Sequence, residues 1–333
     1  MEIPSISEYT KTIKQRDLGG RDMSIVKVSN ITKRFNDKLV LDNISFEIAE
    51  GEIFGLIGPN GAGKSTLINI MTTLVEATNG SVEIGGYNIK KNPIEAKKLI
   101  GLVPQELALI EEMSAYDNLL FFGSLYGLSR KLLKERIEEA LQVTGLTDRK
   151  KEKVKKFSGG MKRRLNIAAA LMHHPKILIM DEPTVGVDPQ SRNHIFEFTR
   201  QICKERNTTI IYTSHYMEEI EELCSKVFII DLGQEIAYGT KEQIKSLSGE
   251  KTKVNLHLNQ SSADLILKLK QLDGVDLVTE LPGQITLTIT KSFKLATAIT
   301  ELESANVELQ SISYEQPRLE DVFLWLTGKT LRD

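Results

Sequence analysis

The residues best suited to chemistry form a glycine-rich loop that ends in a lysine and two hydroxyl residues. An apolar run over 52–57 leads into the loop, and a helical pattern follows it. The loop consists of Gly58, Pro59, Asn60, Gly61, Ala62, Gly63, Lys64, Ser65 and Thr66. Its glycines let backbone N–H groups approach phosphate oxygens, and the positive end of the helix adds to the attraction. The pattern predicts a phosphate-binding loop in which Lys64 contacts the β- and γ-phosphates of a nucleotide and Ser65 ligates Mg²⁺.

Two adjacent carboxylates follow a second apolar strand. Residues 177–180 are all apolar, and Asp181 and Glu182 come directly after them. A carboxylate in this position is suited to organise Mg²⁺, usually through water, and Glu182 is placed to orient or deprotonate an attacking water. Two acids at a strand end could also be simply solvated. The phosphate loop earlier in the chain favours the catalytic interpretation.

Two more polar side chains are expected at the ends of strands. Gln105 follows a short strand over 100–103 and could reach Mg²⁺ or the attacking water, although a solvated loop residue is the simpler interpretation. His215 follows a strand over 208–213, where it can donate to the γ-phosphate or to the hydrolytic water. The other histidines have no such context, and we expect them at the surface: His173, His174, His194 and His257.

A second glycine motif opens the amphipathic helix that precedes the acidic pair. Ser158, Gly159 and Gly160 at a helix start can form another anion site, although an ordinary N-cap serine explains the same pattern. Asp188 is expected to cap the next helix, and reaching across to a partner subunit is a second interpretation. Phe35, at the end of a polar run, could stack on a purine, but an aromatic residue in this position is more often part of a core.

Composition excludes several classes of protein. The 333 residues carry 43 basic and 45 acidic side chains, a net charge of −2, so no global field favours nucleic acid or an anionic surface. The two cysteines, Cys203 and Cys224, have neither disulfide-framework nor zinc spacing, which suits a reducing compartment. The longest apolar runs are far below the ~18 to 20 residues that span a bilayer. We therefore expect no direct membrane span, and any membrane role must come through a partner.

The chain divides into three predicted parts. Residues 1–23 form a polar N-terminal extension without the apolar segment of a secretory signal, and Met23 is a possible alternative start to Met1. Residues 24–248 are expected to form an α/β nucleotide-binding domain, with an antiparallel layer before the loop and a helical subdomain over about 106–172. Residues 249–333 read as strand, helix, strand, strand, helix, strand, which predicts a small ferredoxin-like accessory domain.

Residues 24–248 resemble the nucleotide-binding subunit of an ATP-binding cassette (ABC) transporter. The resemblance lies in seven elements that follow the family's order: Phe35, the loop over 58–66, Gln105, the Ser158 motif over 157–161, the acidic strand over 177–183, Asp188 and His215. It implies an α/β P-loop NTPase core of the ABC ATPase type, with ATP and Mg²⁺ as cofactors. It also implies that Phe35 stacks on adenine, that Gln105 senses Mg²⁺ and the membrane partner, and that His215 contacts the γ-phosphate.

The same resemblance gives the second glycine motif a use. In this family Ser158 and Gly160 complete the site of the opposing subunit in a head-to-tail dimer, so we expect a homodimer in the ATP-bound state. The chain departs from the family where Phe157 and Met161 replace the usual Leu and Gln, and where Phe35 replaces a frequent Tyr. None of these changes removes a charged or phosphate-contacting group, so hydrolysis is expected to survive.

The C-terminal stretch over 317–328 is similar to the ending of subunits from bacterial drug-resistance exporters. The resemblance therefore implies an exporter ATPase that powers a separate membrane-spanning permease from the cytoplasmic face of the membrane. The accessory domain has no catalytic pattern; we expect a regulatory or dimer-contact role, with plain stabilisation as the alternative.

A soluble cassette ATPase acting on ribosomes or DNA is the rival interpretation. Such relatives usually have two cassettes in one chain or a long coiled-coil insert, and this chain has one cassette and neither a basic tail nor heptads. A small-molecule kinase or GTPase would leave the Ser158 motif unexplained.

Overall fold

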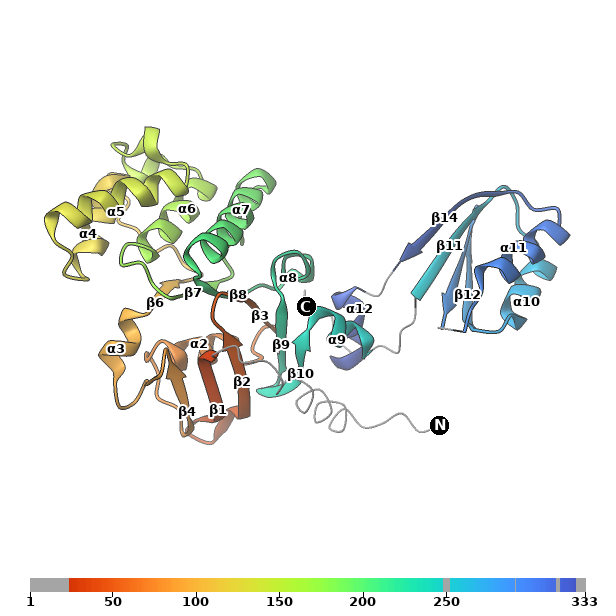
Figure 1. Ribbon diagram of the computed structural model, residues 1–333, viewed down its shortest axis with the longest axis horizontal. Helices are drawn as coiled ribbons and strands as arrows, with labels where there is room; N and C mark the ends of the chain where they lie inside the picture. Colours follow the sequence, from red (N-terminus) through yellow and green to blue (C-terminus); the bar gives the residue numbers. More distant parts are fainter. Residues whose placement is uncertain (1–23, 248–251, 291, 316–317, 328–333) are drawn as a thin grey trace. The chain divides into compact units, whose positions relative to one another are not determined.

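The computed structural model describes residues 24–247, 252–290, 292–315 and 318–327 (Figure 1). These residues separate into two compact units, with the division after residue 241, a few residues before the boundary expected from the sequence. The polar extension over 1–23 and the alternative start at Met23 lie outside the described residues.

A six-stranded sheet forms the centre of the first unit, in the order β10-β9-β3-β8-β7-β6. Its strands are β3 (Ile53–Ile57), β6 (Ile100–Val103), β7 (Ile177–Asp181), β8 (Thr209–Thr213), β9 (Lys226–Asp231) and β10 (Gln234–Thr240). Five of the strands are parallel, and β10 alone runs antiparallel to its neighbour. The parallel strands are buried along most of their length, because elements cover both faces of such a sheet.

An antiparallel sheet in the order β2-β1-β4-β5 shares a core with the central sheet. Its strands are β1 (Ser24–Phe35), β2 (Lys38–Ala49), β4 (Asn79–Ile84) and β5 (Tyr87–Asn88). Phe46 of β2 stacks on Phe54 of β3 at 5.2 Å between ring centroids, and it lies 4.8 Å from Phe228 of β9. Aromatic contacts of this kind fix the antiparallel layer against the strand that leads into the phosphate loop.

The first unit also contains the predicted helical insert, between β6 and β7 (Figure 1). It consists of α4 (Ala115–Ser124), α5 (Arg130–Val143) and α6 (Gly159–Ala170), with short 3-10 turns at Thr147–Arg149 and Val154–Lys156. Serine side chains cap the first turn of all three helices. The insert has its own core, which includes Leu119, Ile137, Leu141 and Leu165. The remaining helices of the unit are α2 (Lys64–Met71), α3 (Pro93–Lys98), α7 (Pro189–Arg206) and α8 (Met217–Leu223).

The second unit has the ferredoxin-like arrangement that the sequence predicts. Its elements are β11 (Thr252–Leu258), α10 (Ala263–Gln271), β12 (Val275–Leu281), β13 (Gln284–Ile289), α11 (Leu295–Ser304) and β14 (Leu309–Glu315), with α9 (Lys241–Ser246) before them and α12 (Leu319–Thr327) after. The four strands pair antiparallel in the order β12-β13-β11-β14. Apolar residues of the four strands and of α10 and α11 form a core in this unit.

In the part of the chain that the structure describes, no helix combines the length and the apolar character that crossing a membrane requires.

The turn between β9 and β10 fixes the phosphate loop to the antiparallel layer. Gly233 N donates to Ala62 O at 3.0 Å, and Asp42 N donates to Gly233 O at 2.8 Å. Gly233 has a φ of +77°, and a Cβ atom there would lie 2.3 Å from Val40 O. Because the backbone cannot move without breaking these bonds, only glycine fits this position.

We expect Gly233→Ala to lower the free energy of unfolding of the first unit by about 2–4 kcal/mol, because strain and a backbone clash combine. Gly86→Ala is the matched control: its φ is +82°, but nothing lies within 4 Å of the added Cβ. That control should cost only about 1 kcal/mol. Urea denaturation of both variants measures the difference, and equal losses would mean that the turn has room for a side chain.

Candidate active site

The glycine-rich loop lies at the carboxyl end of β3 and leads directly into α2, as predicted. Gly58 is packed so tightly that a Cβ atom would lie 2.2 Å from Ile230 O of β9. Gly61 and Gly63 have positive φ values of +79° and +111°. Gly63 is the N-cap of α2, and no side chain caps the first turn. The first N–H groups of this helix therefore face the loop as ready donors for an anion.

The Lys64 side chain is only 6% exposed and lies along the loop. Its Nζ atom donates to Gly58 O at 2.5 Å and to Pro59 O at 3.1 Å. Burial lowers the pKa of this ammonium, while the charges of Glu182 and Asp181 act in the opposite direction. The lysine is thus a buried cation that two carboxylates across the site attract.

The acidic pair is held by a single hydroxyl group of the neighbouring strand. Thr213 Oγ1 of β8 donates to Asp181 Oδ1 at 2.7 Å and accepts from Glu182 N at 2.9 Å. Glu182 has a φ of 47°, which a residue other than glycine seldom adopts. The hydrogen bond to its backbone N–H helps to hold this conformation, and the side chain is only 7% exposed.

Two predicted residues converge on one oxygen of Glu182. Gln105 Nε2 donates to Glu182 Oε2 at 2.9 Å, and His215 Nδ1 lies 3.3 Å from the same oxygen. Gln105 follows β6, Glu182 follows β7 and His215 follows β8. The carboxyl ends of these parallel strands meet at the edge where the phosphate loop leaves β3, which is where open α/β sheets bind ligands.

The residues predicted to hold Mg²⁺ offer oxygen donors of three kinds. Asp181 provides a carboxylate, Ser65 an exposed hydroxyl in the first turn of α2, and Gln105 the amide oxygen that remains after its nitrogen has bonded to Glu182. Burial is the main cause that raises the pKa of Asp181, and the Thr213 hydrogen bond opposes it. Hard oxygen donors with few protein carboxylates suit Mg²⁺, which takes its other ligands from water and phosphate.

The second glycine motif packs against the start of α7. Ser158 is the N-cap of α6 and accepts from Met161 N at 3.3 Å. The residue therefore has the ordinary N-cap role, and its predicted role in anion binding would be additional to that. A Cβ atom on Gly160 would lie 2.1 Å from Ser191 Oγ. Asp188 caps α7 by accepting from Ser191 N at 2.9 Å, a bond that lowers the pKa of Asp188. Ser158 and Gly159 remain exposed.

Phe35 does not belong to the core. It lies at the end of β1 with 46% of its surface exposed, and the Lys33 ammonium lies 4.6 Å from the centroid of its ring. The alternative of core packing is therefore wrong, and the part of the ring that Lys33 leaves exposed can stack on a flat ligand.

The histidines without a predicted role differ from expectation in three cases. His173, His174 and His257 are partly buried rather than exposed. The ring of His173 stacks on Tyr126 at 3.8 Å, and burial lowers its pKa to about 4. His174 lies between charged groups, with its Nε2 atom 2.9 Å from Glu139 Oε2 of α5. His173 and His174 follow α6 in a connection that contacts Tyr126 and α5, which no local pattern reveals, and His257 lies in β11.

The structure also adds residues that the motifs alone do not identify. Thr213 is one of them, and the buried Glu219 of α8 is another. Oε2 of Glu219 accepts from the hydroxyls of Thr184, Tyr212 and Ser214 at 2.8, 3.1 and 2.8 Å. These bonds join the segments that follow β7 and β8, which carry Glu182 and His215. The sequence signals this network only through the hydroxyl residues Thr184 and Ser214, which lie close to Glu182 and His215.

One edge of the parallel sheet gathers a phosphate loop, an acidic pair, a glutamine and a histidine, and a helical insert lies beside it. This arrangement defines a P-loop ATPase of the cassette type. Comparison with known proteins agrees, since the family described as ABC transporter matches residues 41–185. The linearmycin resistance ATP-binding protein LnrL of Bacillus subtilis is 46% identical over 312 residues, which cover 93% of this chain and 100% of that protein. The chain therefore belongs to the ABC transporter ATP-binding protein family, and it is an ATPase.

Other relatives and solved structures agree with this assignment. The daunorubicin resistance ATP-binding protein DrrA3 of Streptomyces coeruleorubidus is 32% identical, over 92% of this chain and 97% of that protein. The structure of CbiO1 from Clostridium perfringens, part of an ABC transporter complex, has a TM-score of 0.62 at 28% identity, over 68% of this chain and 91% of that chain. A dimeric cassette, MJ0796 bound to ADP and Pi, has a TM-score of 0.58 at 26% identity, over 65% of this chain and 98% of that chain.

We expect Thr213→Val to lower kcat for ATP hydrolysis by roughly 10- to 100-fold, because a displaced catalytic group loses much of its effect. Thr199→Val is the matched control, since Thr199 is equally buried but its hydroxyl donates to Ile195 O within α7. Steady-state ATPase assays on both variants test the expectation. If Thr213→Val kept the wild-type kcat, the hydroxyl would not be needed to hold the acidic pair.

Proposed function

We propose that this chain is the ATP-hydrolysing subunit of an exporter of small molecules, with Glu182 as the residue that activates water. The observation that carries the proposal is the convergence of Gln105 and His215 on Glu182 Oε2, at 2.9 and 3.3 Å. A carboxylate held by two such groups beside a buried lysine has the position and the partners of a general base.

In the proposed mechanism, the loop N–H groups and Lys64 hold the β- and γ-phosphates of ATP, and Phe35 stacks on the adenine. A water held by Glu182 and His215 attacks the γ-phosphate in line, and Glu182 accepts its proton. Asp181, Ser65 and Gln105 would hold Mg²⁺, which when bound neutralises charge on the phosphates. Since the reacting groups come from separate strands, small shifts of one segment should switch hydrolysis on or off.

The proposal includes a head-to-tail homodimer in the ATP-bound state. Ser158 and Gly159 are exposed at the positive end of α6, where they can bind the phosphates of a nucleotide on a second copy. Asp188, packed beside Gly160, would reach the same interface. The dimeric form of the similar cassette MJ0796 supports this arrangement. One subunit would thus complete the site of the other, so ATP would act as the contact between them.

The export role rests on what similar proteins are named for. LnrL and DrrA3 are named for resistance to linearmycin and daunorubicin, and a 34% identical protein of Cupriavidus metallidurans is named for Nod factor export. All three alignments cover at least 92% of this chain, so they include the second unit. We propose that the chain works in the same way, bound to a separate permease at the cytoplasmic face of the membrane.

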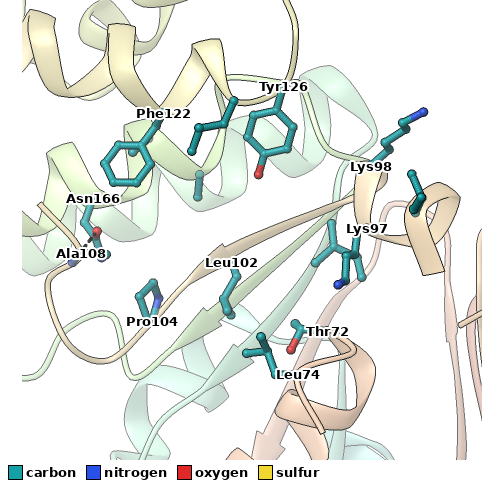
Figure 2. A pocket seen from close by; sticks show the side chains of 15 residues that line it. Thr72, Leu74, Lys97, Lys98, Leu102, Pro104, Ala108, Phe122, Tyr126 and Asn166 are labelled. Atoms are coloured by element: carbon teal, nitrogen blue, oxygen red, sulfur yellow. Dashed lines mark hydrogen bonds between the residues drawn. The ribbon is translucent and has the colours of Figure 1, made fainter. Parts of the chain in front are cut away.

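An apolar cavity of about 530 Å³, lined in part by Pro104, the residue before Gln105, offers a place for the permease. Figure 2 shows Phe122 and Tyr126, at the end of α4, facing Leu102 and Pro104 of the opposite wall. Lys97 and Lys98 lie along one side, and the exposed Leu125 completes the apolar rim. We propose that a cytoplasmic helix of the permease, apolar on one face and acidic on the other, occupies this cavity. Movement there would reach Glu182 through Gln105.

Glu182→Gln should bind ATP without hydrolysing it and so trap the dimer, whereas Lys64→Ala should abolish nucleotide-dependent closure. Size-exclusion chromatography with ATP and Mg²⁺ separates these outcomes, with the exposed Glu197→Gln as control.

The trapped Glu182→Gln protein can then be recovered from native membranes, and the proteins that co-purify with it can be identified by mass spectrometry. A polytopic membrane protein supports the exporter. Ribosomes or DNA-bound factors alone would support the rival soluble cassette, and wild-type turnover by Glu182→Gln would refute the assignment of the base.

We expect Leu125→Glu to remove the permease from such a preparation, since a charge in the apolar rim opposes docking. Leu267→Glu is the matched control, a similarly exposed leucine on α10 of the second unit (57% against 67% for Leu125). Quantifying the co-purified permease for both variants tests the docking site. Retention of the permease by Leu125→Glu would place the contact elsewhere.

A further inference from the structure

Arg163 is a buried charged residue that neither the motifs nor the mechanism explains. It lies in the second turn of α6 and is only 5% exposed. Its Nη1 atom donates to Pro104 O at 3.1 Å and to Gln105 O at 2.8 Å. Burial lowers the pKa of the guanidinium, and attraction to Glu182 opposes this shift. Burying a charge is unfavourable unless its partners are well placed, so the position needs an explanation.

We propose that Arg163 is a positioning residue for Glu182, and that it acts through Gln105. The guanidinium holds the two carbonyls that flank the Gln105 N–H group, and so it fixes the backbone from which this side chain projects. The amide of Gln105 in turn donates to Glu182 Oε2 at 2.9 Å. A planar guanidinium suits this task because its donors have a fixed geometry, which a flexible ammonium lacks.

The position of Arg163 in the chain extends its role. Ser158 and Gly160 begin the same helix, one turn earlier. Because a helix moves as a rigid element, a displacement of its first turn also displaces Arg163 and the carbonyls that Arg163 holds. This part rests on the proposed dimer: when one subunit binds its partner's nucleotide with Ser158, it would adjust Gln105 and Glu182 in its own site. Arg163 would thus link hydrolysis in the two sites.

A purely structural role is the alternative, in which Arg163 only joins α6 to the segment after β6. The two roles differ in one measurable property. A structural residue should affect activity whether or not the Gln105 side chain is present. A residue that acts through Gln105 should lose its influence once that side chain has been removed, because the route to Glu182 is then broken.

The test is a double-mutant cycle on kcat for ATP hydrolysis with Arg163→Met, Gln105→Ala and the double variant. We expect Arg163→Met alone to lower kcat by about 10-fold with less than about a twofold change in KM. In the Gln105→Ala background it should cause no further loss. Losses that multiply in the double variant, or a wild-type kcat for Arg163→Met, would overturn the proposal.

Two further variants guard against simple misfolding. Arg163→Lys keeps a cation with N–H donors for the carbonyls but loses the planar geometry, so it should recover part of the lost kcat. Arg136→Met removes a partly buried arginine of α5 that pairs with Glu139 instead; it should keep its kcat, whatever the change in its melting temperature. Glu182→Gln separates this proposal from the proposed function. If Glu182→Gln hydrolyses ATP normally, the assignment of Glu182 as the base fails. If it is inactive but the losses of Arg163→Met and Gln105→Ala multiply, only the role of Arg163 is refuted.

Discussion

Three charged side chains are buried close to one another at the carboxyl edge of the central sheet, and the rest of the first unit depends on this arrangement. Lys64, Arg163 and Glu182 are 6%, 5% and 7% exposed. Each charge would be costly alone, but the carboxylate attracts both cations and so offsets part of the desolvation. The positions are thus interdependent, because removing one charge leaves the others uncompensated. Such a site can be held only by a rigid scaffold, which the parallel sheet provides.

The sheet supplies this rigidity through its strand order. The strand that ends in the acidic pair, β7, does not lie beside the loop strand β3; β8 lies between them. Thr213 at the end of β8 pairs in register with Asp181, so its hydroxyl reaches the acidic pair directly. The middle strand therefore sets how far the carboxylates lie from the loop. The helical insert approaches the same edge through Arg163, which places a separate subdomain next to the reacting groups.

The sequence predicts the parts of the site that depend on local pattern. The loop, Asp181, Glu182 and His215 were recognisable because each follows an apolar strand, and parallel strands end at a common edge. Thr213 and Arg163 were not, because their importance comes from what lies across the sheet or across the insert. Gly233 is similar: a glycine in a turn is ordinary, and only the approach of Val40 O makes it necessary. The burial of His173 depends on Tyr126, which is distant in the sequence.

The order of strands in the central sheet also constrains how the chain can fold as it is synthesised. The loop strand β3 is among the first parts made, yet its two neighbours, β8 and β9, are among the last of the first unit. Until they emerge from the ribosome, β3 has no neighbouring strand to pair with in the central sheet. Contacts between such distant segments form slowly and leave aggregation-prone surface exposed in the meantime. The described strands of the second unit pair with one another, so their pairing can follow without delay. Nascent chains of this protein should therefore depend on chaperones until β9 is complete.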